Sequence, residues 1–255
     1  MSTHATLRAV VFDCDGVILE SEDLHRVAYN ATFEEFDVRN EDDSPEQIVW
    51  TEEFYNEFQN QVGGGKPKMR WYFNKYGWPT SNLGPAPTTD EEKEKLIDEL
   101  QDWKSTKYQD FITSGKVPPR PGVVRLMDEA RAAGLKVAVC SAATKSSVEV
   151  TLKALIGKDR FEKLDVFMAG DDVPKKKPDP IIYVLAAEKL GVDASECLVI
   201  EDSLIGLQAA LGAKMKCVVT HTPSTASQDF DGADLVLPQV GDELTIDKLK
   251  EVISA

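Results

Sequence analysis

The most constraining feature of this sequence is a series of five short apolar runs, most of them rich in valine and isoleucine. They occupy residues 7–12, 135–140, 164–169, 197–200 and 216–220. Short runs of this kind, bounded by polar or turn residues, are typical of buried parallel strands. Helical patterns lie between them, and a glycine follows each of the patterns at residues 123–133, 181–190 and 204–211. Strands that alternate with helices predict an α/β fold with a doubly wound parallel sheet.

The segment from residue 21 to residue 119 breaks this alternation. It has no good strand pattern, and its acidic and aromatic residues follow helical spacing in residues 24–36, 52–62, 68–77 and 91–112. The sequence VPPRPG at residues 117–122 resists helix formation. We therefore expect a sheet domain of residues 1–20 and 120–255, with an all-helical domain of residues 21–119 inserted after the first strand.

Composition narrows the function classes. The chain has 255 residues and a formal net charge of −15, which argues against general binding to nucleic acid or to an anionic membrane, because both need a basic surface. No apolar run approaches the roughly 18 to 20 residues of a membrane span. The four cysteines lack paired metal-ligand spacing, so we expect free, buried thiols. The amino-terminal sequence MSTHATL contains no apolar signal-peptide core.

Polar side chains follow the predicted strands at their carboxyl ends. The residues in question are Asp13, Cys14 and Asp15 after the first strand, Ser141 after the second, and Glu201, Asp202 and Ser203 after the fourth. A basic run ending in Lys177 lies between the third and fourth strands. Alone, each has an ordinary explanation as a turn, a helix cap or a solvated loop. Parallel strand ends converge on one edge, where ligands bind, so their order predicts a single site.

The chemistry that suits this set is phosphoryl transfer. Clustered carboxylates need a compensating cation, and Mg²⁺ prefers oxygen ligands and shares its shell with phosphate. One carboxylate can attack phosphorus, and a second, two residues on, can protonate the leaving oxygen and later activate water. A hydroxyl and a lysine can stabilise the other phosphoryl oxygens. Cys14 points to the opposite face of an extended chain from its acidic neighbours, so we interpret it as a packing residue.

The stretches FDCDGV, VCSAAT, KKKPDP and VIEDSLIGLQAA resemble, in order, the four signature motifs of the haloacid dehalogenase-like hydrolases. The resemblance implies a Rossmann-like core, a helical cap domain, a bound Mg²⁺ and an aspartyl-phosphate intermediate on Asp13. The implied catalytic residues are Asp13 as nucleophile, Asp15 as general acid and base, and Ser141 and Lys177 as phosphoryl-binding groups. The implied metal ligands are Asp13, Asp15 through its carbonyl, Glu201 and Asp202.

The cap sequence suggests the substrate. The glycines of VGGGKPKMRWYF allow backbone N–H groups to approach an anion, and Lys66 supplies charge. Together with ESEDLHR, YFNKYGWP and RPGV, this stretch resembles the CbbY-type members of the family. That likeness implies a phosphatase that converts xylulose 1,5-bisphosphate, an inhibitory by-product of Rubisco, to xylulose 5-phosphate. A small-molecule sugar bisphosphate would then be the partner.

The same resemblance assigns substrate contacts. Glu22 and His25 are implied to bind sugar hydroxyls. The implied holders of the distal phosphate are Gly64, Gly65, Lys66 and Arg120, helped by Tyr55 and Arg70. The implied contacts to the transferring phosphoryl group are Ser141, Ala142 and Lys177. Relatives often carry threonine where this chain has Ala142, so one hydroxyl contact is expected to be absent.

Other functions remain open at this point. The nearest rival is a β-phosphoglucomutase-like mutase, although mutases carry a Ser-Arg element where this chain has GGGKPKM. A phosphatase for a monophosphate is weaker, because the cap offers groups for a second phosphate. A dehalogenase would not need the acidic pair Glu201–Asp202, and a non-catalytic scaffold would not need acids at every motif.

Resemblance also gives the expected setting of the protein. We expect a monomer in the chloroplast stroma of a plant or alga, with its transit peptide absent from this chain, or otherwise a cytoplasmic protein. An acidic insertion, RNEDDSPEQ at residues 39–47, is expected to be a solvated surface loop.

Overall fold

The computed structural model describes residues 6–40, 46–59, 61–62 and 64–255. The amino-terminal residues 1–5 and the centre of the acidic insertion therefore lie outside the described residues. The chain divides into two compact units, one of Met1–Ser21 with Ile112–Ala255 and one of Glu22–Phe111. The second boundary falls before the expected residue 119, so the proline-rich return segment belongs to the sheet unit.

The first unit is built on one six-stranded sheet, in which the strand order is β3-β2-β1-β4-β5-β6 and every pairing is parallel. The strands are β1 Ala9–Phe12, β2 Lys136–Cys140, β3 Val166–Met168, β4 Cys197–Glu201, β5 Lys216–Thr220 and β6 Leu235–Leu237. The prediction of a doubly wound parallel α/β sheet is confirmed. β6 is a sixth strand that the sequence patterns did not indicate.

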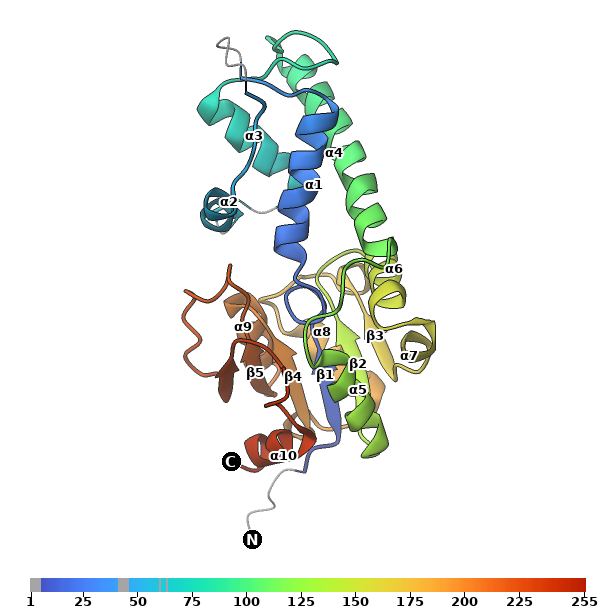
Figure 1. Cartoon of the computed structure of the whole chain (residues 1–255). Helices are drawn as coiled ribbons and strands as arrows, with labels where there is room; N and C mark the ends of the chain where they lie inside the picture. Colours follow the sequence, from blue (N-terminus) through green and yellow to red (C-terminus); the bar gives the residue numbers. More distant parts are fainter. Residues whose placement is uncertain (1–5, 41–45, 60, 63) are drawn as a thin grey trace. The chain divides into compact units, whose positions relative to one another are not determined.

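Helices cover both faces of this sheet, as parallel sheets require. The helices of the first unit are α5 Val123–Ala132, α6 Lys145–Leu155, α7 Lys158–Glu162, α8 Ile181–Leu190, α9 Leu204–Gly212 and α10 Ile246–Ser254. Alternate strand residues point to opposite faces, and one set, including Val11, Cys140 and Val199, packs against α8 and α9 in a single apolar cluster. Figure 1 shows α5 on the other side of the sheet.

The second unit is helical in its described residues. Its helices are α1 Ser21–Glu35, α2 Glu52–Gln59, α3 Gly65–Tyr76 and α4 Asp90–Thr113. An aromatic cluster forms its core, with Trp50 fully buried and its ring centroid 4.7 Å from that of Tyr29 and 5.1 Å from that of Phe33. Aromatic side chains bury large areas, which explains how a unit this acidic on its surface obtains a core.

Two further expectations concern burial. Cys14, Cys140, Cys197 and Cys217 are all buried and free, so the interpretation of the thiols as packing groups is confirmed. Among the described residues, no helix combines the length and the apolar character needed to cross a membrane.

Candidate active site

The site begins where the order of strands reverses. β1 lies between β2 and β4, and the chain beyond β1 stays paired, since the Asp13 amide donates to the Ile200 carbonyl at 2.9 Å. Asp13 follows β1, Glu201 ends β4 and Asp202 comes next. One carboxylate oxygen from each of these three residues lies within 4.8 Å of the others. Acids from two distant parts of the sequence therefore meet at the carboxyl ends of the strands, where doubly wound sheets bind ligands.

Lys177 sits between two of these acids. Its ammonium lies 2.5 Å from Oδ1 of Asp13 and 2.7 Å from Oε1 of Glu201, and it donates to the Cys140 carbonyl at 3.1 Å. The Lys177 side chain is only 4% exposed, whereas the neighbouring Lys175 side chain is 75% exposed. Of the three lysines in the basic run, the one named from the sequence is thus the one that the fold buries.

Glu201 is fixed on several sides. The Tyr183 hydroxyl on α8 donates to Oε1 at 2.5 Å, and the Asp202 amide donates to Oε2 at 3.1 Å. α9 approaches so closely that a Cβ built on Gly206 would lie 2.0 Å from Oε2. A residue with a side chain at position 206 would therefore compete with the Glu201 carboxylate for the same space.

Asp15 lies in the turn that follows Asp13. The Ser141 hydroxyl, at the end of β2, donates to Oδ2 of Asp15 at 3.4 Å and accepts from the Ala143 amide at 3.1 Å. Gly16 comes next with φ at +82°, and a Cβ there would lie 2.0 Å from Oδ2 of Asp202. Both the left-handed backbone and the close approach require glycine, so this turn brings Asp15 and Asp202 to adjacent positions.

Ala142 lies directly beyond Ser141, where its carbonyl would be 2.3 Å from a Cβ on Gly170. Its methyl side chain offers no hydroxyl, as expected from the sequence. Any polar contact from this position must come from its backbone.

The electrostatics of the cluster indicate a shortage of positive charge. Burial raises the pKa of Asp13 to about 8, and the carboxylates of Glu201 and Asp15 add to the shift. Burial also raises the pKa of Asp15 and, together with Glu201, raises that of Asp202 well above its usual range. Burial opposes the charge on Lys177, but Asp13 and Glu201 raise its pKa overall, so the lysine stays protonated. One ammonium faces four carboxyl groups, and a hard divalent cation with oxygen ligands fits this donor set.

The residues named in the helical unit fall into two groups. His25 on α1 is half-buried in a polar cluster. Its ring stacks on Tyr108 with centroids 4.1 Å apart, and its Nδ1 lies 2.7 Å from the Lys104 ammonium. Burial and Lys104 lower the pKa of His25 well below its usual range, so a neutral ring accepts this hydrogen bond. The negative charge of Glu22 acts to raise the pKa values of Tyr55 and Lys104, which places Glu22 near the same cluster.

Lys104 is a residue that the sequence did not single out. It is 5% exposed, its ammonium lies 4.6 Å from the Tyr29 ring centroid, and burial, with the charge of Lys68, lowers its pKa to about 7. A lysine inside a long charged helix has the local pattern of a solvated residue. Lys104 differs from the more exposed lysines of α4 because it packs against His25 and Tyr29 of α1. The sequence of α4 alone does not predict that packing.

The remaining cap residues have other partners here. Lys66 pairs with Asp98 at 2.8 Å, and Arg70 pairs with Glu94 at 2.5 Å. Both acidic partners lie on α4, and Lys66 is exposed whereas Arg70 is half-buried. Gly64 precedes α3 with φ at +84°, and Gly65 lies close to the Gln101 side chain. Tyr55 is buried in the aromatic core, and its hydroxyl has no hydrogen-bond partner among the described residues.

Arg120 is held within the sheet unit. The resemblance to CbbY-type proteins implied that Arg120 binds the distal phosphate. In the structure Arg120 is 8% exposed. Its guanidinium donates to the backbone carbonyls of Gly16, Thr220, His221 and Pro238. All four terminal N–H groups are used in these bonds. In this arrangement no terminal donor of Arg120 is left for a phosphate, so its assignment to the distal phosphate stays a prediction.

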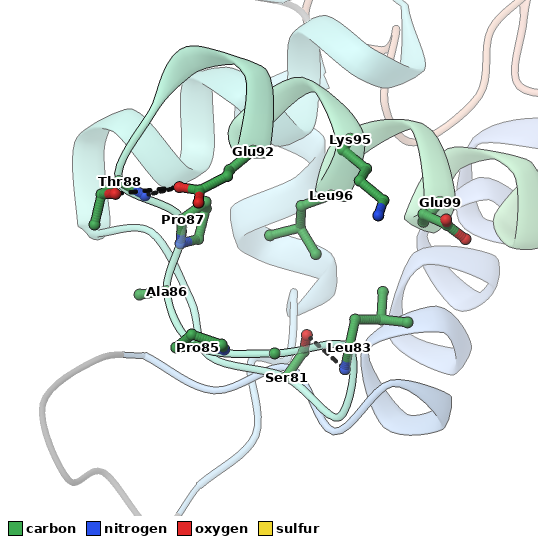
Figure 2. Close-up of a pocket in the computed structure, with 11 residues that line it drawn as sticks. Ser81, Leu83, Pro85, Ala86, Pro87, Thr88, Glu92, Lys95, Leu96 and Glu99 are labelled. Atoms are coloured by element: carbon green, nitrogen blue, oxygen red, sulfur yellow. Dashed lines mark hydrogen bonds between the residues drawn. The ribbon is translucent and has the colours of Figure 1, made fainter.

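A cavity of about 370 Å³ lies elsewhere, within the helical unit. Figure 2 shows that the Pro85–Pro87 loop and α4 line it, with Leu83 and Leu96 among the apolar groups. None of the predicted site residues lines this cavity. The acids at the carboxyl ends of β1 and β4, and not this cavity, are the candidate active site.

Comparison with known proteins decides the family. A profile for haloacid dehalogenase-like hydrolases matches residues 7–214. The chain belongs to the haloacid dehalogenase-like hydrolases. The prediction of this family, and of a hydrolytic enzyme, is confirmed.

Individual relatives refine the placement within this hydrolase family. A haloacid dehalogenase-like hydrolase domain-containing protein of Arabidopsis thaliana is 60% identical over 97% of this chain and 77% of its own length. A CBBY-like protein of the same plant is 45% identical over 92% of this chain and 69% of its own length. These matches identify a hydrolase of the CbbY type, a phosphatase, as the sequence predicted.

A solved structure supports the same branch. A mutant of CbbY from Rhodobacter sphaeroides, in complex with xylulose 1,5-bisphosphate, is 32% identical and covers 96% of this chain and 99% of its own. The two structures align with a TM-score of 0.73. The likeness therefore extends over both units of the chain and not over the sheet alone.

Proposed function

We propose that this enzyme is a Mg²⁺-dependent phosphatase that hydrolyses xylulose 1,5-bisphosphate to xylulose 5-phosphate. The observation that carries the proposal is the cluster of Asp13, Lys177, Glu201 and Asp202 beside Asp15, at the carboxyl ends of β1 and β4. The choice of sugar bisphosphate is supported by the CbbY mutant from Rhodobacter sphaeroides, whose structure contains xylulose 1,5-bisphosphate.

The metal would be held by carboxylate oxygens of Asp13, Glu201 and Asp202, with the Asp15 carbonyl as a further ligand. When bound, Mg²⁺ would neutralise charge on the cluster and on the substrate phosphate. Its positive charge would also favour the ionised form of Asp13, whose pKa burial raises to about 8.

Asp13 is the proposed nucleophile. Its carboxylate attacks the phosphorus of the substrate, the bond from phosphorus to the sugar oxygen breaks, and Asp13 carries the phosphoryl group. Lys177 and the Ser141 hydroxyl would bind the non-bridging oxygens, since Lys177 already lies 2.5 Å from Asp13.

Asp15 is the proposed general acid and base. Burial raises its pKa, which favours the protonated form that can give its proton to the leaving sugar oxygen. In the second half-reaction Asp15 takes a proton from water, the water oxygen attacks phosphorus, and the bond to Asp13 breaks. Free phosphate leaves and both carboxyl groups return to their first state.

The helical unit is proposed to act as the substrate-selecting cap. Glu22, His25 and Lys66 are the proposed contacts with the sugar and the distal phosphate, and Lys104 joins them because it holds His25 at 2.7 Å. We also propose that the enzyme works as a monomer. The plant relatives support a second proposal, that it acts in the chloroplast stroma.

Phosphate release across a substrate panel tests the proposal. The panel contains xylulose 1,5-bisphosphate, ribulose 1,5-bisphosphate, phosphoglycolate and β-glucose 1-phosphate, each with Mg²⁺ and with EDTA. We expect Mg²⁺-dependent release that strongly prefers xylulose 1,5-bisphosphate. A flat profile would remove the assigned substrate and leave the hydrolase, and isomerisation of β-glucose 1-phosphate primed by a bisphosphate would favour the mutase.

Lys66→Ala tests the cap separately. We expect its KM to rise for the bisphosphate and to stay unchanged for a monophosphate, because Lys66 is assigned to the second phosphate. The matched control is Lys158→Ala, which removes another exposed ion pair, with Glu162 on α7. Equal effects of Lys66→Ala on both substrates would show that Lys66 does not bind the distal phosphate.

A further inference from the structure

Arg120 lies in the segment that returns the chain to the sheet unit, between α4 and α5. Its backbone amide donates to the Ile18 carbonyl at 2.8 Å. This contact joins the returning segment to the segment that leaves β1. The two passages of the chain are therefore fastened to each other within the sheet unit.

The Arg120 side chain extends this connection to the carboxyl ends of other strands. Its Nη1 donates to the carbonyls of Gly16 and Thr220, the latter at 2.8 Å, and its Nη2 donates to His221 at 2.9 Å and to Pro238 at 2.8 Å. Thr220 ends β5, and Pro238 follows β6. One buried guanidinium thus links three separate segments at the carboxyl ends of the strands.

The link to Gly16 reaches the candidate catalytic groups. Gly16 lies between Arg120 and Asp202, since a Cβ on Gly16 would lie 2.0 Å from Oδ2 of Asp202. The turn is also compact, because the Gly16 amide donates to Leu19 at 2.7 Å and the Ile18 amide donates to Cys14 at 2.9 Å. A shift of the Gly16 peptide would therefore also move the preceding residue, Asp15, and disturb the space beside Asp202.

We propose that Arg120 is a positioning residue, which holds the Asp15–Gly16 turn against the ends of β5 and β6 and so fixes Asp15 and Asp202 for catalysis. This inference rests on the phosphatase function proposed above. It assigns Arg120 no contact with substrate. Its expected signature is a loss of kcat that is the same for every substrate, because the misplaced groups act on the reacting phosphate that all substrates share.

Arg120→Lys tests the proposal, with Arg125→Lys as the matched control. Lysine keeps the charge but cannot reach four carbonyls at once. Arg125 also donates to backbone carbonyls, those of Gly241 at 2.6 Å and Leu244 at 2.9 Å, but it does not contact Gly16. The assay measures kcat and KM for xylulose 1,5-bisphosphate and for p-nitrophenyl phosphate, a monoester without a second phosphate.

We expect Arg120→Lys to lower kcat by about 10- to 100-fold on both substrates, as displacements on the scale of 1 Å do, with little change in either KM. Arg125→Lys should retain the wild-type kcat. A rise in KM for the bisphosphate alone would overturn the proposal and restore the distal-phosphate assignment. Wild-type kcat in Arg120→Lys would also overturn it.

Amide hydrogen exchange gives a readout that does not need the assigned substrate. We expect faster exchange in the peptide of residues 13–20 in Arg120→Lys and not in Arg125→Lys, with exchange in β4 unchanged in both. Unchanged exchange in residues 13–20 would contradict the proposal even if the enzyme preferred another substrate. If Arg120→Lys does not fold, Arg120→Gln, which keeps two donors, replaces it in both measurements.

Discussion

Replacement of Gly206 by alanine is the most direct test of the acidic cluster. Gly206 lies on α9, where alanine is favoured over glycine by about 1 kcal/mol, so local propensity alone predicts a more stable protein. The new Cβ, however, would lie 2.0 Å from Oε2 of Glu201, where ordinary contact begins at 3.4 Å. Because Glu201 is 1% exposed, its carboxylate can relieve this overlap only inside the site, by a shift of about 1 Å that costs on the order of 100-fold in rate.

That displacement breaks identifiable contacts. The bonds from Glu201 to Lys177 at 2.7 Å and to Tyr183 at 2.5 Å would both lengthen. Each charge-assisted bond contributes about 1.5–3 kcal/mol, so their weakening offsets the helix gain. We expect Gly206→Ala to lower kcat by about 100-fold and to raise the half-saturating Mg²⁺ concentration by about 10- to 100-fold.

The assay is phosphate release across a Mg²⁺ titration, with thermal unfolding measured in parallel. Gly212→Ala is the matched control, because it lies on the same helix and its Cβ would meet Pro180 at 3.1 Å, away from the carboxylates. The control should retain activity and Mg²⁺ response. A Gly206→Ala enzyme with wild-type kcat and Mg²⁺ response would refute the reasoning, because Glu201 would then not need its observed position.

Three further predictions concern single groups. Asp13→Asn should abolish turnover while thermal unfolding stays cooperative, and activity above about 1% of wild type would exclude the nucleophilic role, since nucleophile removal costs far more than this. Tyr183→Phe, which removes one donor to Glu201, should raise the half-saturating Mg²⁺ concentration by about tenfold, and an unchanged titration would show that Tyr183 does not support the metal site. For Lys104, burial lowers the pKa to about 7 in the folded state, so between pH 7 and about 10 the unfolded chain holds a proton that the folded chain lacks. The free energy of unfolding of wild type and of Lys104→Met is measured with denaturant across this window. We expect the wild-type value to rise with pH relative to the variant, by about 1 kcal/mol per pH unit. A difference that does not change with pH would contradict a lowered pKa of Lys104.

Local patterns predicted β1 to β5 and the helices α1 to α5, α8 and α9. The β-branched runs at residues 197–200 and 216–220 match β4 and β5 almost residue for residue, and the pattern at residues 91–112 matches α4. β6 was missed because three residues, partly exposed at the sheet edge, give no clear period. Sheet membership at that edge depends on pairing with β5, which the segment itself does not encode.

The candidate site was predictable where chemistry follows a strand. Asp13, Ser141 and Glu201 each come at a strand end, so convergence followed from topology. Arg120 and Lys104 were not predictable in the same way. Both are long cations whose roles depend on where they are buried, and burial of a cation is set by distant segments that pack around it.

The pairing of β1 with β4 has a consequence for how the chain acquires its structure. Phe12 and Ile200 are neighbours in register although most of the chain, residues 13–199, lies between them. Non-local pairing of this kind slows folding, because the loop must close before the contact forms. During synthesis, Asp13 leaves the ribosome long before Glu201 and Asp202, so its carboxylate stays hydrated until β4 arrives. The repulsion among the acids therefore arises only when β4 pairs with β1, so we expect Mg²⁺ to accelerate that pairing more than the pairing of β1 with β2.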